Sequence, residues 1–169
     1  MPLLADVQLP CVEQAAIVVD ALAEEPAWAE ATTVRGFTTF TPGTGQPATG
    51  DTAVHLLADA EHLYLFFEAE DPEPGKLRAS LGRRDTRWND DFVGVYLDPA
   101  GEAQRAYLFG VTARGALMDG MRVGENEDLS WDGIWQAEAR RTDTGWAAEI
   151  AIPWRILRHP ADCDRLFSL

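Results

Sequence analysis

Short apolar segments recur along this chain between turns that contain Gly, Pro and Asp, and most of these segments are rich in aromatic or β-branched residues. This arrangement is typical of an all-β domain. The clearest segment is residues 146–152, where large apolar side chains alternate with Ala and Glu, as on a strand with one buried face. Turn residues at 59–61, 98–102 and 142–145 indicate hairpins. The predicted strands are residues 54–57, 63–69, 92–97, 106–111, 116–122, 134–140 and 146–152.

Two places favour short helices. Residues 24–31 place Pro26 early, ahead of good helix formers, and we expect Trp28 to turn inward there. The segment after Pro153 predicts a second short turn. No linker or repeat interrupts the chain, so residues 1–169 fit one domain that is long enough to bury a core.

Acidic residues outnumber basic ones by 28 to 14, and the formal net charge is −14. This charge opposes docking on polyanions, so we expect neither nucleic acid nor an anionic membrane as a partner. No stretch reaches transmembrane length, and no signal peptide stands near the amino terminus, although an excised domain would also lack one. Cys11 and Cys163 match no metal-binding or redox spacing. Two free thiols are the default, and a disulfide requires the two terminal segments to lie side by side.

The segment 83–98, RRDTRWNDDFVGVYLD, gathers arginines, acids, an amide and an indole directly ahead of an apolar strand. Guanidinium and amide groups bond sugar hydroxyls, and a flat indole stacks on the apolar face of a pyranose ring. The alternative is a solvated hairpin edge on which the indole is half buried. This segment predicts a site for a polar, ring-shaped ligand.

Two tryptophans stand in polar stretches, Trp88 in RWNDD and Trp131 in LSWDG, where a large indole gains little from burial unless something covers it. We expect them to stack on a saccharide while Arg84, Asn89 and Asp90 bond its hydroxyls. Indoles folded over the rim of the domain are the other reading. Three other tryptophans, Trp28, Trp146 and Trp154, have apolar neighbours that indicate core packing.

Catalytic motifs are missing from the sequence: there is no phosphate-binding Gly-rich loop, no HExxH and no Gly-x-Ser-x-Gly elbow. The neighbouring carboxylates Asp90 and Asp91 would point to opposite faces of a strand and so cannot converge on one glycosidic bond. We therefore expect a domain that is not an enzyme. Oxygen-rich loops suit a structural Ca²⁺, and Asp85, Asp91 and Asp128 are the predicted ligands.

The succession HLYLFFEAED, RRDTRWNDDFVGVYLD, RAYLFGVTARG and SWDGIWQAEARRTDTGWAAEIAIPWRIL resembles the family 9 carbohydrate-binding modules and their DOMON-like relatives. The resemblance runs over residues 17–157, and GWAAEIAIPWRIL and DDFVGVYLD are its most specific parts. It implies a jelly-roll-like antiparallel β-sandwich that binds a polysaccharide or oligosaccharide without converting it, with Ca²⁺ in some members. It also implies an accessory role in polysaccharide degradation or uptake, an extracellular, periplasmic or cell-surface location, and a catalytic or barrel domain on a longer natural chain.

Two alternatives remain. Some relatives of this sandwich bind haem for electron transfer, and the axial ligands available here are Met118, Met121, His55 and Lys76. The third possibility is a structural domain of a larger outer-surface protein. A Soret band in purified protein distinguishes the haem reading from the other two.

Overall fold

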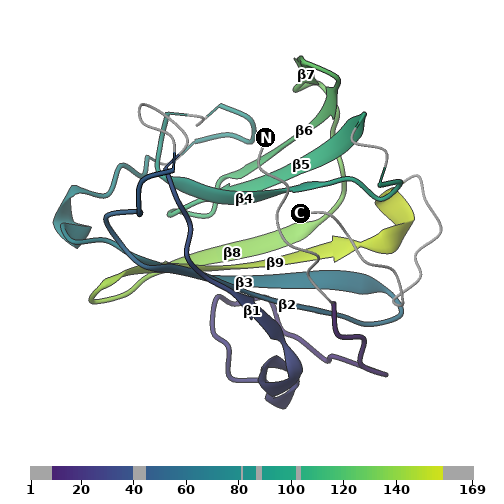
Figure 1. Ribbon diagram of the computed structural model, residues 1–169, viewed down its shortest axis with the longest axis horizontal. Helices are drawn as coiled ribbons and strands as arrows, with labels where there is room; N and C mark the ends of the chain where they lie inside the picture. The colour runs from purple at the N-terminus through teal and green to yellow at the C-terminus, as the bar shows by residue number, and fades with distance from the viewer. Residues whose placement is uncertain (1–8, 40–44, 81, 87–88, 102–103, 158–169) are drawn as a thin grey trace.

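Nine strands form two antiparallel sheets that face each other in the computed structural model, which describes residues 9–39, 45–80, 82–86, 89–101 and 104–157 (Figure 1). The larger sheet has the order β1 (Thr32–Val34), β2 (Thr52–Ala58), β3 (His62–Glu70), β9 (Gly145–Pro153), β8 (Gln136–Arg141). The smaller sheet consists of β4 (Phe92–Leu97), β5 (Arg105–Thr112), β6 (Leu117–Val123) and β7 (Asn126–Asp128). Short 3-10 turns complete the structure: η1 (Pro26–Glu30), η2 (Pro74–Lys76) and η3 (Trp154–Ile156). The predicted all-β antiparallel sandwich with short helices is confirmed.

The predicted hairpins form as expected, with β2 paired to β3, β4 to β5 and β8 to β9. Two strands were not predicted, β1 and β7, and each is only three residues long, too short to show an alternating pattern. Strand β8 begins at Gln136 rather than at residue 134, and Ile134 is 80% exposed. The chain turns away before β8 because the Gly133 N–H donates to the Asp119 carboxylate at 2.7 Å instead of joining the sheet.

The core lies between the two sheets and is closed. Leu65 of β3, Ile150 and Ile152 of β9, and Phe109 of β5 are each at most 1% exposed and belong to one apolar cluster. Trp146 and Trp154 are buried in the same cluster, as predicted from their neighbours. The inner faces of the described strands are filled by these side chains, so a ligand site belongs on a rim or an outer face.

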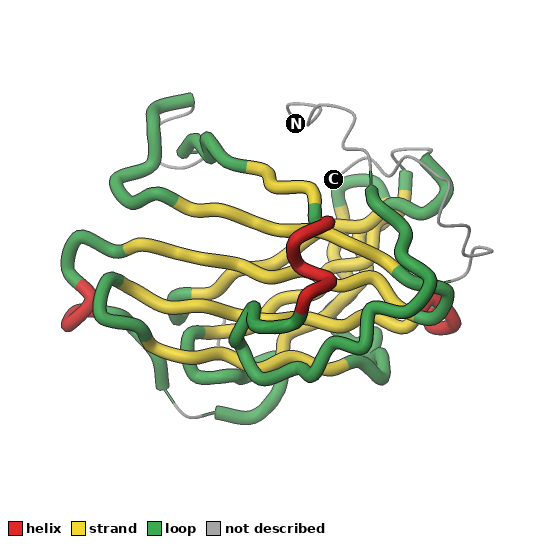
Figure 2. The backbone as a smooth tube through the Cα atoms, turned by 90° about the horizontal axis from the view of Figure 1, so that it is seen from below, coloured by secondary structure: helices red, strands yellow, loops and turns green. Residues whose placement is uncertain are grey.

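The N-terminal segment (residues 12–31) lies across the outer face of the larger sheet, as Figure 2 shows from that side. Trp28 turns inward, as predicted, and packs on Phe66 of β3 with ring centroids 5.7 Å apart. Below the segment, the fully buried Glu149 of β9 accepts the backbone N–H groups of Asp20 and Ala21 at 2.8 and 3.0 Å. A second apolar cluster and one buried carboxylate therefore fasten this segment to the sheet.

Several expectations fall outside the described residues. Trp88 and Cys163 are among these, so stacking by Trp88 and a Cys11–Cys163 disulfide stay predictions. In the described part of the chain, no helix is long and apolar enough to cross a membrane.

Candidate functional site at one edge of the sandwich

Arg84 is the centre of a polar cluster at the edge of the smaller sheet. Its Nε donates to Asp119 Oδ1 at 2.7 Å, and its Nη2 donates to Asp119 Oδ2 and, at 2.7 Å, to the Gly133 carbonyl. Arg84 Nε also lies 2.9 Å from Asp132 Oδ1, and the guanidinium carbon lies 5.8 Å from the ring centroid of Trp135. These contacts, which we call the Arg84 cluster, connect the loop before β4 to β6 and to the loop before β8.

Asp119 is an acid on the inward face of β6 and is fully buried. Besides Arg84 it accepts the Gly133 N–H at 2.7 Å and the Trp135 Nε1–H at 3.3 Å, both on Oδ2. A buried carboxylate is tolerated only when it is paired and hydrogen-bonded, and here four donor contacts from three residues satisfy it. Asp119 therefore has a structural role at this edge.

Asp85 attaches the loop to the free edge of β6. Its N–H donates to the Leu117 carbonyl at 3.0 Å, and its Oδ1 accepts the Asp119 N–H at 2.8 Å. The backbone of Asp85 has φ 59°, a left-handed conformation that Asp adopts more readily than most residues. This turn directs the side chains of two successive residues, Arg84 and Asp85, onto β6.

The charges of the cluster shift the pKa values of both of these residues. Burial alone would lower the pKa of Arg84, but the hydrogen bond and charge of Asp119, with the charges of Asp132 and Asp85, raise it above its ordinary value. Burial and the neighbouring carboxylates of Asp119 and Asp132 raise the pKa of Asp85, against the opposing effects of the Asp119 N–H and Arg84. The guanidinium stays charged and paired.

Two carboxylates that were selected from the sequence, those of Asp90 and Asp91, close the base of the loop before β4. Asp91 Oδ2 accepts the Arg78 N–H at 2.7 Å, and Asp90 Oδ2 accepts the Ser80 N–H at 2.8 Å. Asn89 is exposed beside them. Of the residues predicted to bond a ligand, Arg84 is engaged within the protein, Asp90 has one oxygen engaged, and Asn89 faces solvent.

Trp131 is half-buried at the same edge. Its ring meets Tyr107 and Phe109 edge-on, with centroids 5.1 and 5.7 Å apart. A Cβ added to Gly133 would lie 2.6 Å from the Trp131 ring, so only glycine allows this approach. Part of the indole covers the core, and the remainder is open to solvent.

Calcium is the metal that the sequence predicts for this region. The carboxylates of Asp85, Asp119 and Asp132 have oxygens within 4.8 Å of one another, close enough to reach one cation. Arg84 already bonds Asp119 and Asp132 and supplies one positive charge to these three acids. The other two predicted ligands are not in this group, and the Asp128 side chain accepts the N–H of Ser130 at 3.0 Å. The guanidinium is therefore one counter-charge of the cluster, and a bound Ca²⁺ stays a prediction.

The side chains suggested for haem are far from forming an axial pair. Met118 and Met121 lie on opposite faces of β6, and His55, in the other sheet, bonds Thr33 and Glu68 through its two ring nitrogens. Lys76 pairs with Glu73 at 2.6 Å. The described arrangement does not favour the haem alternative.

Sequence reasoning missed Asp119, Asp132 and Trp135 as members of the cluster. Asp119 carried a signal, because it is a charged residue among the inward positions of a predicted strand, between Leu117 and Met121. Asp132 and Trp135 carried none, since their role depends on how two distant loops meet.

Comparison with protein families identifies the family of this chain. The sequence matches the carbohydrate family 9 binding domain-like family over residues 19–166. The chain belongs to that family. Membership in the carbohydrate family 9 binding domain-like family supports a non-catalytic binding domain, in agreement with the resemblance found in the sequence. No curated protein sequence matches the chain.

Solved structures share the sandwich of this family 9-like domain. A protein from Bacteroides uniformis, described as carbohydrate-binding, superposes with a TM-score of 0.69 at 14% identity, covering 92% of this chain and 76% of that one. A family 9 carbohydrate-binding module from Caldicellulosiruptor kristjanssonii, in complex with glucose, gives 0.60 at 15% identity over 90% of this chain and 71% of that one. Its complex with cellotriose gives 0.59 at 15% identity, covering 90% and 69%. At these identities the likeness shows a common fold.

Proposed function

We propose that this domain binds a neutral saccharide without converting it, at the edge where the loop before β4 meets the loop before β8. The observation that carries the proposal is the Arg84 cluster, because it joins the two loops that contain the residues predicted from the sequence to bind the sugar. Membership in a carbohydrate-binding family supports the ligand class. Glucose and cellotriose, which the module from Caldicellulosiruptor kristjanssonii binds, are the first ligands to test.

The proposed contacts are divided between apolar and polar side chains. Trp131 and Trp88 supply flat apolar surface, and Asn89 and Asp90 bond hydroxyls. Hydrogen bonding of Arg84 to the sugar stays a prediction, and its Nε and Nη2 donors are already engaged by Asp119, Asp132 and the Gly133 carbonyl. Through these contacts Arg84 also holds the two loops in place.

The wider context follows from the family. We infer that the domain has no enzyme activity of its own and works outside the cytoplasm or at the cell surface, beside a catalytic or barrel domain. A structural Ca²⁺ is retained as a prediction for the acidic loops. Loss of thermal stability on chelation, restored by added Ca²⁺, would support that ion.

Calorimetric titration with glucose, cellotriose and xylo-oligosaccharides tests the binding function. Replacing Trp88 with Ala, or Trp131 with Phe, should weaken binding roughly tenfold or more, because buried aromatic anchors dominate such interfaces. Phe37→Ala is the matched control, since Phe37 is an exposed aromatic residue near β1, on the other sheet. Affinity should change little between low and high salt because the ligand carries no charge. Absence of heat with every sugar would end the proposal.

A further inference from the structure

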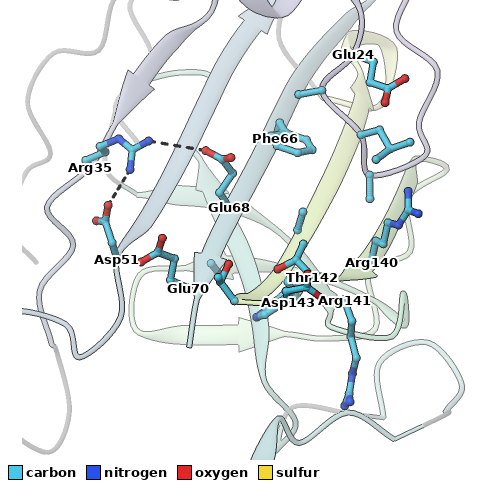
Figure 3. A pocket seen from close by; sticks show the side chains of 17 residues that line it. Glu24, Arg35, Asp51, Phe66, Glu68, Glu70, Arg140, Arg141, Thr142 and Asp143 are labelled. Carbon is cyan, nitrogen blue, oxygen red and sulfur yellow. Dashed lines mark hydrogen bonds and ion pairs between the residues drawn. The ribbon is translucent and has the colours of Figure 1, made fainter. Parts of the chain in front are cut away.

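A groove of about 950 Å³ opens on the outer face of the larger sheet, on the opposite layer from the Arg84 cluster (Figure 3). Strands β3, β8 and β9 form it where their ends meet, and residues 21–24 of the N-terminal segment close one end. We call it the outer-face groove. None of the residues predicted from the sequence to bind a ligand lines it.

The register of the strands determines which side chains lie opposite each other across this groove. Arg140 of β8 pairs with Ala147 of β9, and Ala147 lies beside Glu68 of β3. Arg140 and Glu68 are therefore two strand spacings apart, roughly 10 Å, with only a methyl group between them. Figure 3 shows the two charged side chains on opposite sides of the groove. Phe66 lies two residues before Glu68 on β3 and lines the same groove. The small Ala147 makes the groove.

The two opposite charges do not neutralise each other. Arg140 is exposed, and it has no ion pair within 4.0 Å among the described residues. Glu68 is held from the other side, where its Oε2 lies 3.0 Å from His55 Nε2 and 3.8 Å from the Arg35 guanidinium. Arg35 is itself fixed by Asp51 at 2.8 Å. A positioned carboxylate and an unpaired guanidinium thus face a common space.

The charges and the backbone pairing of the groove limit the class of ligand that it can bind. The side chains that line it include more acids than arginines, which disfavours a polyanion. An extended peptide would need unpaired strand edges, but the backbones of β3, β9 and β8 are paired to one another at this point. A hydroxyl-rich ring satisfies both sides: hydroxyls accept from Arg140 and donate to Glu68, and ring C–H groups rest on Ala147 and Phe66.

We propose that the outer-face groove is a second saccharide-binding site, in which Arg140 and Glu68 bond hydroxyls of one sugar unit from opposite sides. The choice of ligand class rests on the proposed function, but the groove itself does not depend on the edge site. Two sites on opposite layers would let one domain contact two stretches of glycan and gain avidity.

Residue-resolved NMR titration of the full chain with cellotriose and with xylotriose tests this site. The expected result is saturable shifts of the backbone amides of Glu68, Ala147 and their neighbours. Arg140→Ala should raise the dissociation constant read from those amides at least fivefold, because it removes charged hydrogen bonds. Arg105→Ala, an exposed arginine on β5 in the other sheet, is the matched control and should leave them unchanged.

The variants separate failure of this site from failure of the proposed function. Trp131→Phe should weaken the shifts at the edge and leave those of the groove intact. Saturable edge shifts with no response at the groove would overturn the second site alone, and so would groove shifts that Arg140→Ala leaves unaltered. Shifts at neither site with both sugars would overturn both proposals.

Discussion

Replacing Asp119 with Ala is expected to lower the free energy of unfolding by about 3–5 kcal/mol, the cost of breaking a buried ion pair from one side. The variant leaves Arg84 partly buried without its bidentate partner and removes the acceptor of the Gly133 and Trp135 N–H groups. Urea unfolding of the wild type and the variant at neutral pH measures the difference. Saccharide affinity at the edge should fall as well, because both loops lose their common anchor.

Asp132 provides the control for this experiment. It contacts the same guanidinium at 2.9 Å, but its side chain is 71% exposed, so Asp132→Ala should cost about 1 kcal/mol or less. The double variant Arg84→Met with Asp119→Leu should recover part of the loss, since the buried carboxylate and its guanidinium partner are then removed together. Equal destabilisation by Asp119→Ala and Asp132→Ala would show that the cluster does not work as a buried pair.

The strands of this fold were predictable because their cause is local. In β9, Ile150 and Ile152 face the core while Ala147 and Glu149 face the N-terminal segment, and this alternation is visible in the sequence. Strands β1 and β7 escaped prediction because three residues of edge pairing leave no periodic signal. Their existence depends on the neighbouring strand that they meet.

The candidate site was predictable only in its location. The segment rich in Arg, Asp and Asn does form a polar cluster, but Arg84 bonds Asp119, which lies 35 positions away. A sequence shows which side chains can donate and accept, not which distant partner will satisfy them. For the same reason the outer-face groove had no signature: Arg140 and Glu68 face each other only through the register of β3, β9 and β8.

Glu149 is expected to make stability fall as the pH rises from about 5 to 8. Burial raises its pKa to about 7, and the charges of Glu25 and Asp20 add to this effect against the N–H groups of Asp20 and Ala21. Because the folded pKa lies above the ordinary value of 4.5, the stabilisation is complete below that value and is lost as the pH rises through about 7. A difference of this size corresponds to about 3 kcal/mol. Urea unfolding of the wild type across this pH range measures the slope.

Glu149→Gln removes the titration and keeps an oxygen for the two N–H groups. Relative to the wild type, this variant should gain about 3 kcal/mol between pH 5 and 8. Glu138→Gln is the matched control: Glu138 lies opposite Glu149 in the register of β8 and β9 but is exposed, so its curve should run parallel to that of the wild type. Parallel curves for Glu149→Gln and the wild type would show instead that Glu149 stays ionised under the N-terminal segment. Hydrogen exchange of the Asp20 and Ala21 amides locates the effect. If the deprotonated carboxylate releases this segment, these amides should exchange faster at pH 8 than the pH dependence of intrinsic exchange alone explains.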